Sequence, residues 1–291
     1  MIFLFIDGFG LGEENPSKNP VYAAKAPNIK HILRDYIVIP TDPSLGVPGL
    51  PQSATGQTAI FTGVNASEVL GRHLSGQPTV TLNKIIHKTN LFKELIKMGL
   101  KVTNSNVYRD EYLQKMLDPK DRRNRPSVTS VMTLSSGIKF RTVEDFMQGM
   151  GVYHDITGQI IKDSGYEVEL ITHVEAARRV FSISRKFDFT LYEHFMTDII
   201  GHKADMELAV AEIELLDGFL GQLLEFVDLE EDMIIIASDH GNIEDASVKT
   251  HTMNLVPTVI MGKIPQGVNV KVESLTDIMP LVLDIFRKRQ L

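Results

Sequence analysis

The chain has 291 residues, of which 43 % are apolar and 23 % charged, and its formal net charge is −7. These proportions are typical of a globular protein, and the acidic balance argues against a nucleic-acid-binding surface. The absence of cysteine excludes disulfides and thiolate metal sites. No apolar run approaches the roughly 18 residues that a membrane span needs, and the first apolar run lacks the features of a secretory signal. We therefore expect a cytoplasmic protein without a membrane partner.

Short apolar runs alternate with segments of helical periodicity along the chain. The sequence predicts strands at residues 2–6, 36–40, 100–103, 188–195, 233–237 and 256–261. It predicts helices where apolar residues recur at helical spacing, at 90–98 and 203–227 between strands and at 276–288 after the last strand. This alternation is typical of an α/β fold with a doubly wound, mostly parallel sheet and helices on both faces.

One segment interrupts the alternation. Residues 106–165 are more polar and less regular than their surroundings, and we predict that they form a small inserted lid. The core would then consist of residues 1–105 and 166–291. Because ligands of open α/β sheets bind at the carboxyl ends of the strands, such a lid would overhang the site. In its middle, Arg122, Arg123 and Arg125 are candidates to grip a phosphate or carboxylate of the substrate, with a solvated loop cluster as the alternative interpretation.

Candidate metal ligands follow several of the predicted strands. The carboxyl ends of parallel strands meet at one edge of a sheet, so ligands that follow different strands converge there. A single Asp in such a place is often a turn or helix cap, and a lone His is usually not a ligand. The prediction depends on six such residues falling at the same edge of the sheet. Three carboxylates and three imidazoles are enough for two divalent cations, and this ligand mixture suits Mn²⁺ or Zn²⁺. In chain order they are Asp7, Asp198, His202, Asp239, His240 and His251.

A candidate nucleophile lies between these ligands in the sequence. Ser53 precedes a helix-like segment, where serine is also the preferred N-cap residue. The positive end of a helix favours bound phosphate and lowers the cost of forming an alkoxide, and a metal contact would complete the activation. The sequence therefore predicts Ser53 as the nucleophile and a metal ligand, with Thr55 as the alternative nucleophile.

Together the motifs resemble the metalloenzyme branch of the alkaline phosphatase superfamily, most closely the cofactor-independent phosphoglycerate mutases and phosphopentomutases. The resemblance implies an alkaline-phosphatase-like fold and a phosphoserine mechanism on two metals. It also implies that Asp7, Ser53, Asp239 and His240 hold one metal and that Asp198, His202 and His251 hold the other. The motifs are Asp7-Gly8-Phe9-Gly10, Ser53-x-x-Gly56, Asp198-x-x-Gly201-His202, Ser238-Asp239-His240-Gly241-Asn242 and His251-Thr252-x-Asn254-x-Val256-Pro257.

The chain departs from the mutase pattern in three ways. Gln57 stands where the mutases usually have His, and Leu255 stands where they have Pro. The 106–165 segment is much smaller than the second domain of the independent phosphoglycerate mutases. We therefore expect the chain to share the metal-binding core of the family, whereas the resemblance does not specify its substrate.

These observations predict a two-metal phosphoryl-transfer enzyme that acts on a small phosphorylated metabolite, in the manner of a phosphomonoesterase. The first alternative is a phosphoglycerate mutase-like or phosphopentomutase-like intramolecular phosphotransferase. The second is a non-catalytic metal-binding protein of the same fold. A dinucleotide-binding enzyme is a further alternative because of Gly8-Phe9-Gly10-Leu11-Gly12, but the glycine spacing differs from G-x-G-x-x-G and no suitable acidic residue closes a second strand. Oligomeric state is not specified by the sequence.

Overall fold

A computed structural model describes residues 1–118 and 125–289. Within them lies a six-stranded sheet in the order β2-β6-β5-β1-β4-β3. The central strand β1 pairs parallel with β4 on one side and β5 on the other, and β3 pairs parallel with β4. The strands are β1 (Ile2–Ile6), β2 (Ile37–Thr41), β3 (Val102–Asn104), β4 (Phe189–His194), β5 (Met233–Ala237) and β6 (Val256–Gly262).

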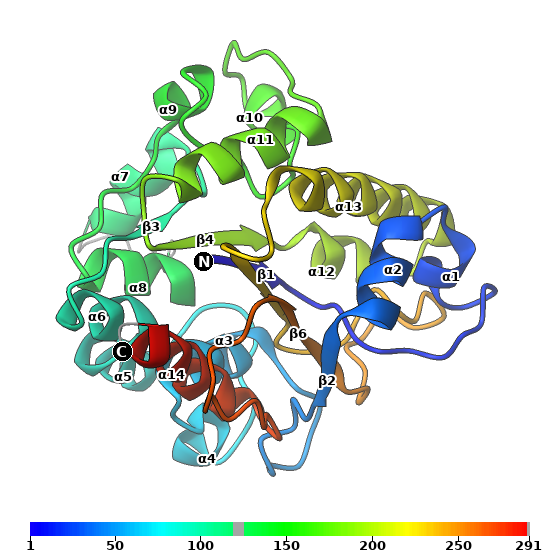
Figure 1. Cartoon of the computed structure of the whole chain (residues 1–291). Coiled ribbons are helices and arrows are strands. Elements are labelled where there is room, and N and C mark those ends of the chain that lie inside the picture. Colours follow the sequence, from blue (N-terminus) through cyan, green and yellow to red (C-terminus); the bar gives the residue numbers. More distant parts are fainter. Residues whose placement is uncertain (119–124, 290–291) are drawn as a thin grey trace.

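Helices cover both faces of this sheet, as the sequence predicts (Figure 1). One layer contains α2, α11 and α13, and the other contains α3, α6, α8 and α14. Among the described helices, none is long and apolar enough to cross a membrane. The helices are α1 (Pro20–Ala23), α2 (Pro27–Asp35), α3 (Ser53–Thr62), α4 (Ala66–Leu70), α5 (Val80–Lys88), α6 (Leu91–Lys97), α7 (Asp110–Leu117), α8 (Val128–Ser135), α9 (Val143–Met147), α10 (Gln159–Asp163), α11 (His173–Ser184), α12 (Met196–Gly201), α13 (Met206–Phe226), a 3₁₀ turn (Leu275–Asp277) and α14 (Ile278–Arg289).

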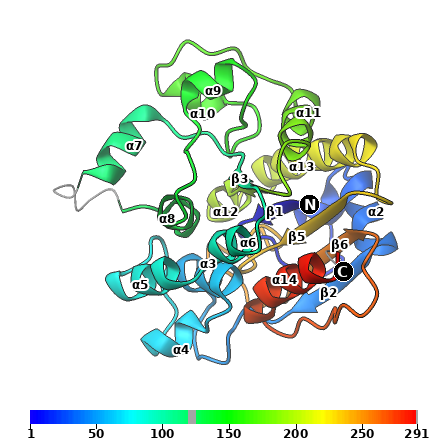
Figure 2. The same cartoon turned by 60° about the vertical axis from the view of Figure 1, so that its left-hand side comes forward.

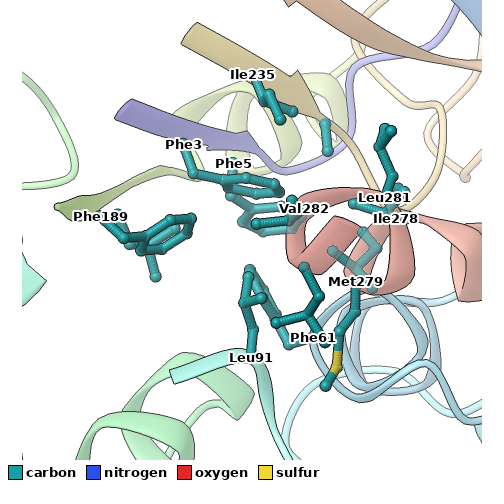
Figure 3. Close-up of a cluster of buried hydrophobic side chains, with 14 of the residues drawn as sticks. Phe3, Phe5, Phe61, Leu91, Phe189, Ile235, Ile278, Met279, Leu281 and Val282 are labelled. Carbon is teal, nitrogen blue, oxygen red and sulfur yellow. The ribbon is translucent and has the colours of Figure 1, made fainter. Parts of the chain in front are cut away.

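The continuous apolar runs become strands that are buried on both faces. Successive side chains of a strand point to opposite faces, so each central strand contributes to two separate cores. Phe3 and Phe5 of β1 pack with Phe61 of α3 and Phe189 of β4 in the larger core (Figure 3). The alternate residues of β1, which are Ile2, Leu4 and Ile6, belong to the core under α2, α11 and α13.

The sixth strand runs against the others. β6 is antiparallel to both of its neighbours, β5 and β2, while the remaining strands share one direction. The sheet is therefore mostly parallel, as predicted. Because β5 and β6 are antiparallel, the loop between them begins and ends at the carboxyl edge of the sheet. His251 reaches that edge directly, since it lies in this loop.

β1 and β5 match the predicted boundaries, and the boundaries of the other predicted elements differ by at most three residues. β3 starts at Val102 and not at Leu100, because Gly99 has a positive φ of 81° and Leu100 bonds back to the last turn of α6. α13 starts at Met206 because the side chain of Asp205 caps its first turn. These local hydrogen bonds fix where each element begins.

The 106–165 segment has two structural parts. Helix α8 packs with α5 and α3 and places Val128, Val131 and Met132 in the larger core. The remainder includes α7, α9 and α10, which project beside the sheet (Figure 2). A small apolar cluster holds this remainder together and extends just beyond the segment to Val168; it is formed by Val107, Val143, Phe146, Tyr153, Ile161 and Val168. The division into core and lid stays a prediction, with α8 contributing to the core layer.

Candidate metal centre and adjoining cavity

The six predicted ligands come together at the carboxyl edge of three adjacent strands, β4, β1 and β5. Asp7 follows β1, and its backbone N–H donates to the carbonyl of His194 at the end of β4. Asp198 lies in α12, directly after β4, and Asp239 and His240 follow β5. The convergence that strand order predicts is thus present in the structure.

Asp7, Asp239 and His240 form one possible ligand group, and all three are buried. His240 Nε2 lies 3.2 Å from Asp7 Oδ1 and 3.6 Å from Asp239 Oδ2. Gln57 Nε2 donates to Asp7 Oδ2 at 3.0 Å and to Asp239 Oδ2 at 3.2 Å. One amide therefore holds both carboxylates in place.

Asp198, His202 and His251 meet on the other side of the centre. Asp198 Oδ1 lies 3.3 Å from His251 Nε2 and 3.4 Å from His202 Nε2. The Nδ1 atoms of both rings lie against backbone carbonyls, that of His251 at 2.8 Å from Pro51 O and that of His202 at 2.9 Å from Lys249 O. Such contacts fix the ring tautomer and leave Nε2 as the free ligand atom.

The two halves of the centre touch. The rings of His240 and His251 are stacked, with centroids 3.7 Å apart and an angle of 14° between the planes. His240 also forms a possible ligand group with Asp198 and His251, in addition to the group with Asp7 and Asp239. The geometry brings all six ligands together, and the assignment of each to one of two metals stays a prediction.

Ser53 lies at the same centre. Its Oγ is 3.0 Å from His240 Nε2. The N-cap interpretation of Ser53 is wrong, because Gln52 occupies the cap position and Ser53 is the first helical residue of α3. Thr55 is fully buried and its hydroxyl donates to the carbonyl of Gln52, so it does not face the centre. Of the two candidate hydroxyls, only Ser53 contacts a ligand.

Charges at the centre are strongly coupled. Burial, together with the nearby Asp239, raises the pKa of Asp7 well above its usual range, and burial also raises the pKa of Asp239. Burial opposes the charged form of His240, but the Asp239 and Asp7 carboxylates outweigh it and raise the pKa of His240 to about 10. Burial opposes ionisation of Asp198 as well, yet the adjoining His251 and His240 and the hydrogen bond from Asn242 lower the pKa of Asp198. The buried carboxylates of the centre therefore lie close together with too little positive charge to balance them.

The residues present fit divalent cations. Asp7 Oδ1 is buried and accepts no well-oriented hydrogen bond from any described residue. The Nε2 atoms of His202 and His251 lie 3.1 Å apart, with both Nδ1 positions committed to carbonyls. Two such lone pairs facing each other need a proton or a cation between them. Carboxylate and imidazole donors without thiolate match Mn²⁺ or Zn²⁺ better than a soft metal.

The glycine-rich segment after β1 makes room for a side chain of a neighbouring loop, and this explains its glycines without a bound dinucleotide. A Cβ on Gly10 would lie 2.3 Å from Glu244 Oε1, and one on Gly12 would lie 2.8 Å from Glu244 Cγ. Glu244 is buried and accepts hydrogen bonds from the backbone N–H groups of Gly10 and Asn242. The glycines therefore give a loop carboxylate room to join the segments after β1 and β5.

A cavity of about 570 Å³ adjoins the centre. Asp7, Ser53 and Asp198 line it on one side, and residues of the 106–165 segment line it on the other. Of the three predicted arginines, Arg125 lines this cavity and is exposed. Arg122 and Arg123 lie outside the described residues.

Three residues of the site were not assigned a role from the sequence. Gln57 lies one helical turn after Ser53, so the i, i+4 spacing on α3 could have placed both on one face. Asn242 donates to Asp198 Oδ1 at 2.6 Å, and its place in the motif after β5 was the available indication. Glu193 lines the cavity, is buried, and accepts a hydrogen bond from Thr129 at 2.7 Å. A carboxylate inside a predicted strand was the indication for Glu193.

Comparison with known proteins agrees with this geometry. A sequence profile of the Metalloenzyme superfamily matches residues 1–290. The chain belongs to the Metalloenzyme superfamily. Membership implies binding of divalent metal, and it confirms the resemblance that the motifs predicted.

Curated relatives carry the name of one enzyme. The 2,3-bisphosphoglycerate-independent phosphoglycerate mutase of Desulforudis audaxviator is 32 % identical over 106 residues, which are 34 % of this chain and 21 % of the relative. The enzyme of that name from Moorella thermoacetica is 31 % identical over 111 residues, 36 % of this chain and 22 % of the relative. The matches thus span about a fifth of these longer proteins.

Solved structures share the fold over nearly the whole chain. An alkaline phosphatase from the Antarctic bacterium TAB5 superimposes with a TM-score of 0.57 and 14 % identity, covering 98 % of this chain and 97 % of that one. A phosphoglycerate mutase of Leishmania mexicana gives a TM-score of 0.57 and 10 % identity, with 96 % and 93 % covered. The alkaline-phosphatase-like fold that the sequence predicts is confirmed.

Proposed function

We propose that the protein is a two-metal phosphoryl-transfer enzyme that acts on a small phosphorylated metabolite and passes the phosphoryl group to water. The observation that carries the proposal is the position of Ser53, whose Oγ lies 3.0 Å from His240 Nε2 at the edge of the ligand cluster. The mutase and phosphatase names of the relatives and structural neighbours support the same reaction class.

Ser53 is suited to act as the nucleophile. As the first residue of α3 it lies at the positive end of a helix of ten residues, where an alkoxide and a phosphate are both favoured. After loss of its hydroxyl proton, Ser53 Oγ would attack phosphorus in line. The bond between phosphorus and the ester oxygen on the opposite side would break, and this oxygen would take up a proton from water and leave as the alcohol. Bound divalent cations would supply neutralisation of the phosphoryl oxygens and of the serine alkoxide.

The positioning groups of the chain keep the ligand atoms aimed at this reaction centre. Gln57 holds Asp7 and Asp239, while backbone carbonyls orient His202 and His251. Because these side chains are held before substrate arrives, little reorganisation accompanies the transfer. Water would then attack the phosphoserine and regenerate Ser53.

A second opening next to Ser53 favours hydrolysis over mutase chemistry. This cavity of about 420 Å³ is lined by Ser53, Asp198, His202, Lys249 and His251 among others, and by no described residue of the 106–165 segment. A mutase must keep water away from its phosphoenzyme while the substrate reorients. The opening instead gives water a path to Ser53 that the predicted lid does not cover.

Mutase activity is the second candidate, because the curated relatives that match part of the chain are phosphoglycerate mutases. The test incubates the Mn²⁺-loaded and Zn²⁺-loaded protein with phosphoglycerates, pentose phosphates and aryl phosphates. Inorganic phosphate and positional isomers are followed together. Phosphate release supports the hydrolase; isomers without phosphate release would replace it with the mutase. Metal binding without either product would leave the non-catalytic alternative.

A further inference from the structure

The cavity beside Ser53 is large for a three-carbon substrate. Its volume of about 570 Å³ falls in the range of about 300–1,000 Å³ that is typical of pockets for drug-sized ligands. It extends from the metal-ligand edge to α7 and to the segment before α10. A short phosphorylated acid bound at Ser53 would leave most of this space to water.

Stacked rings line the part of the cavity that the 106–165 segment and Phe195 provide. Tyr108 and Tyr112 are stacked, with centroids 6.0 Å apart and 18° between the planes. His154 is stacked on Phe195 with centroids 3.6 Å apart and an angle of 20°. Flat aromatic faces of this kind favour a ligand that is itself a flat ring.

Two buried polar atoms of the same wall lack partners. Arg109 Nε and His154 Nδ1 are buried, and no described residue forms a hydrogen bond with either. Arg109 is held in place by donation from Nη1 to Ser164 Oγ at 2.6 Å. A buried polar atom without a partner is costly, so each side chain would gain a hydrogen bond if a small rotation turned that atom toward a ligand in the cavity that Arg109 and His154 line.

The state of His154 makes it a hydrogen-bonding group and not a cation. Burial, with the nearby His194 and Arg109, lowers the pKa of His154 well below its usual range. A neutral imidazole offers one donor and one acceptor, whereas Arg109 offers only donors. Together they match a ring edge that carries both acceptors and a donor.

We propose that this cavity binds the base of a nucleoside 5′-monophosphate, stacked on the aromatic wall and hydrogen-bonded at its edge by Arg109 and His154. The inference rests on the proposed function, which places the phosphoryl group at Ser53. A hydrocarbon ring could stack on the same aromatic wall but would form no hydrogen bond with Arg109 or His154. Ser127 and Ser130 line the cavity as well and offer hydroxyl groups to a sugar.

The kinetic test compares three esters on the metal-loaded protein: a set of nucleoside 5′-monophosphates, phenyl phosphate and glycerol phosphate. We expect kcat/KM for the preferred nucleotide to exceed that for the other two by about tenfold or more. His154→Ala should lower the ratio of nucleotide to glycerol phosphate activity about tenfold. Tyr166→Phe is the control, because Tyr166 packs against the apolar cluster of the 106–165 segment without lining this cavity; the ratio should not change.

A binding measurement separates this inference from the proposed function. Calorimetric titration of the metal-loaded protein with phosphate-free nucleosides should detect binding that His154→Ala weakens, with Arg109→Lys as a second variant if His154→Ala fails to fold. No nucleoside binding, or equal kcat/KM for glycerol phosphate and nucleotide, overturns the inference while the phosphatase stands. Equal activity on phenyl phosphate overturns recognition of the ring edge. Turnover of none of the esters overturns the proposed function, and nucleoside binding then decides the inference alone.

Discussion

His202 and His251 approach each other through the same kind of atom: their Nε2 atoms lie 3.1 Å apart, and each Nδ1 lies against a backbone carbonyl. Since a neutral imidazole with Nδ1–H committed presents a lone pair at Nε2, this contact is unfavourable until a positive charge lies near it. Asp198 Oδ1 completes the group at 3.3 Å from His251 Nε2. The arrangement has direct consequences for metal binding.

We predict that each chain binds two divalent cations, and that His202→Ala and His251→Ala weaken the same one. Each substitution removes a ligand from the Asp198 group, so affinity at that position should fall by roughly 10–100-fold or more. Elemental analysis and metal titration measure this, and His240→Ala should affect the other cation. His87→Ala is the control, since His87 is exposed on α5. Separate effects of His202 and His251 on different ions would contradict the partition.

Ser53→Ala should abolish turnover with little loss of stability. The hydroxyl makes no N-cap hydrogen bond, so we expect the free energy of unfolding to change by less than about 1 kcal/mol. Activity should fall by a factor on the order of 10³ or more, because the nucleophile is gone. Thr55→Ser, which keeps the buried hydroxyl, should stay active. Mass spectrometry of quenched wild type should find phosphate on Ser53; phosphate on Thr55 would reassign the nucleophile.

Gln57→Leu should weaken the cation held by Asp7 and Asp239. The substitution preserves side-chain size but removes the donor that bridges both carboxylates at 3.0 and 3.2 Å. Loss of such a positioning contact typically costs roughly 10–100-fold in metal affinity. Competition with a fluorescent chelator measures the affinity, and Gln159→Leu on α10 provides the matched control. Unchanged affinity in Gln57→Leu would show that the bridge does not position the ligands.

Glu193 should make metal-free protein less stable as pH rises. Burial, opposed by the hydrogen bond from Thr129, raises the pKa of Glu193 from 4.5 to about 7. Between these values the folded protein holds a proton that the unfolded chain releases, so the free energy of unfolding falls with rising pH, by at most on the order of 3 kcal/mol. Glu193→Gln should remove this dependence of the free energy of unfolding on pH. Urea unfolding at about pH 5 and about pH 8 measures it.

The control for Glu193 is Glu167→Gln, because Glu167 is exposed. Relative to wild type, Glu193→Gln should gain stability between the lower and the higher pH, whereas Glu167→Gln should not. An identical effect of Glu193→Gln at both values would mean that this carboxyl does not titrate in the interval.

Glu244→Gln should destabilise the fold by about 3 kcal/mol, because a neutral amide accepts through only one oxygen. In the wild type, Oε2 accepts from Gly10 N at 3.0 Å and Asn242 N at 2.7 Å, and Oε1 accepts from Asn254 Nδ2 at 3.0 Å and from the Thr252 hydroxyl. Denaturant unfolding with chelator present measures the loss. Glu225→Gln, at an exposed position of α13, should stay within about 0.5 kcal/mol of wild type. A comparable loss in both variants would argue against this role for Glu244.

The sequence was most informative where a residue type and a strand end coincide. Apolar runs closed by Asp7 and Asp239 predict both the strands and the shared edge, because parallel topology alone brings such ends together. The direction of β6 was not predicted, since apolar periodicity is the same in parallel and antiparallel strands. The bridging role of Gln57 also depends on how α3 is rotated against the sheet, which periodicity does not specify.

The aromatic lining of the cavity could not be predicted from the sequence. Tyr108 precedes α7, His154 precedes α10 and Phe195 follows β4, so they meet only through the packing of the 106–165 segment. Its composition predicts a polar lid, and the small apolar cluster that organises it is spread over residues 107–168. Side chains that converge from loops leave no periodic pattern.

The central position of β1 sets the order in which the centre can form during folding. Ile2 pairs with Thr190 on one side and with Ile234 on the other, and Gly8 N donates to Asp239 Oδ1, 231 residues away. Contacts of such sequence separation are slow to form. The first ligand to leave the ribosome, Asp7, must therefore wait for almost the whole chain to be synthesised before its partners exist, and metal capture becomes a late event in the biogenesis of the protein.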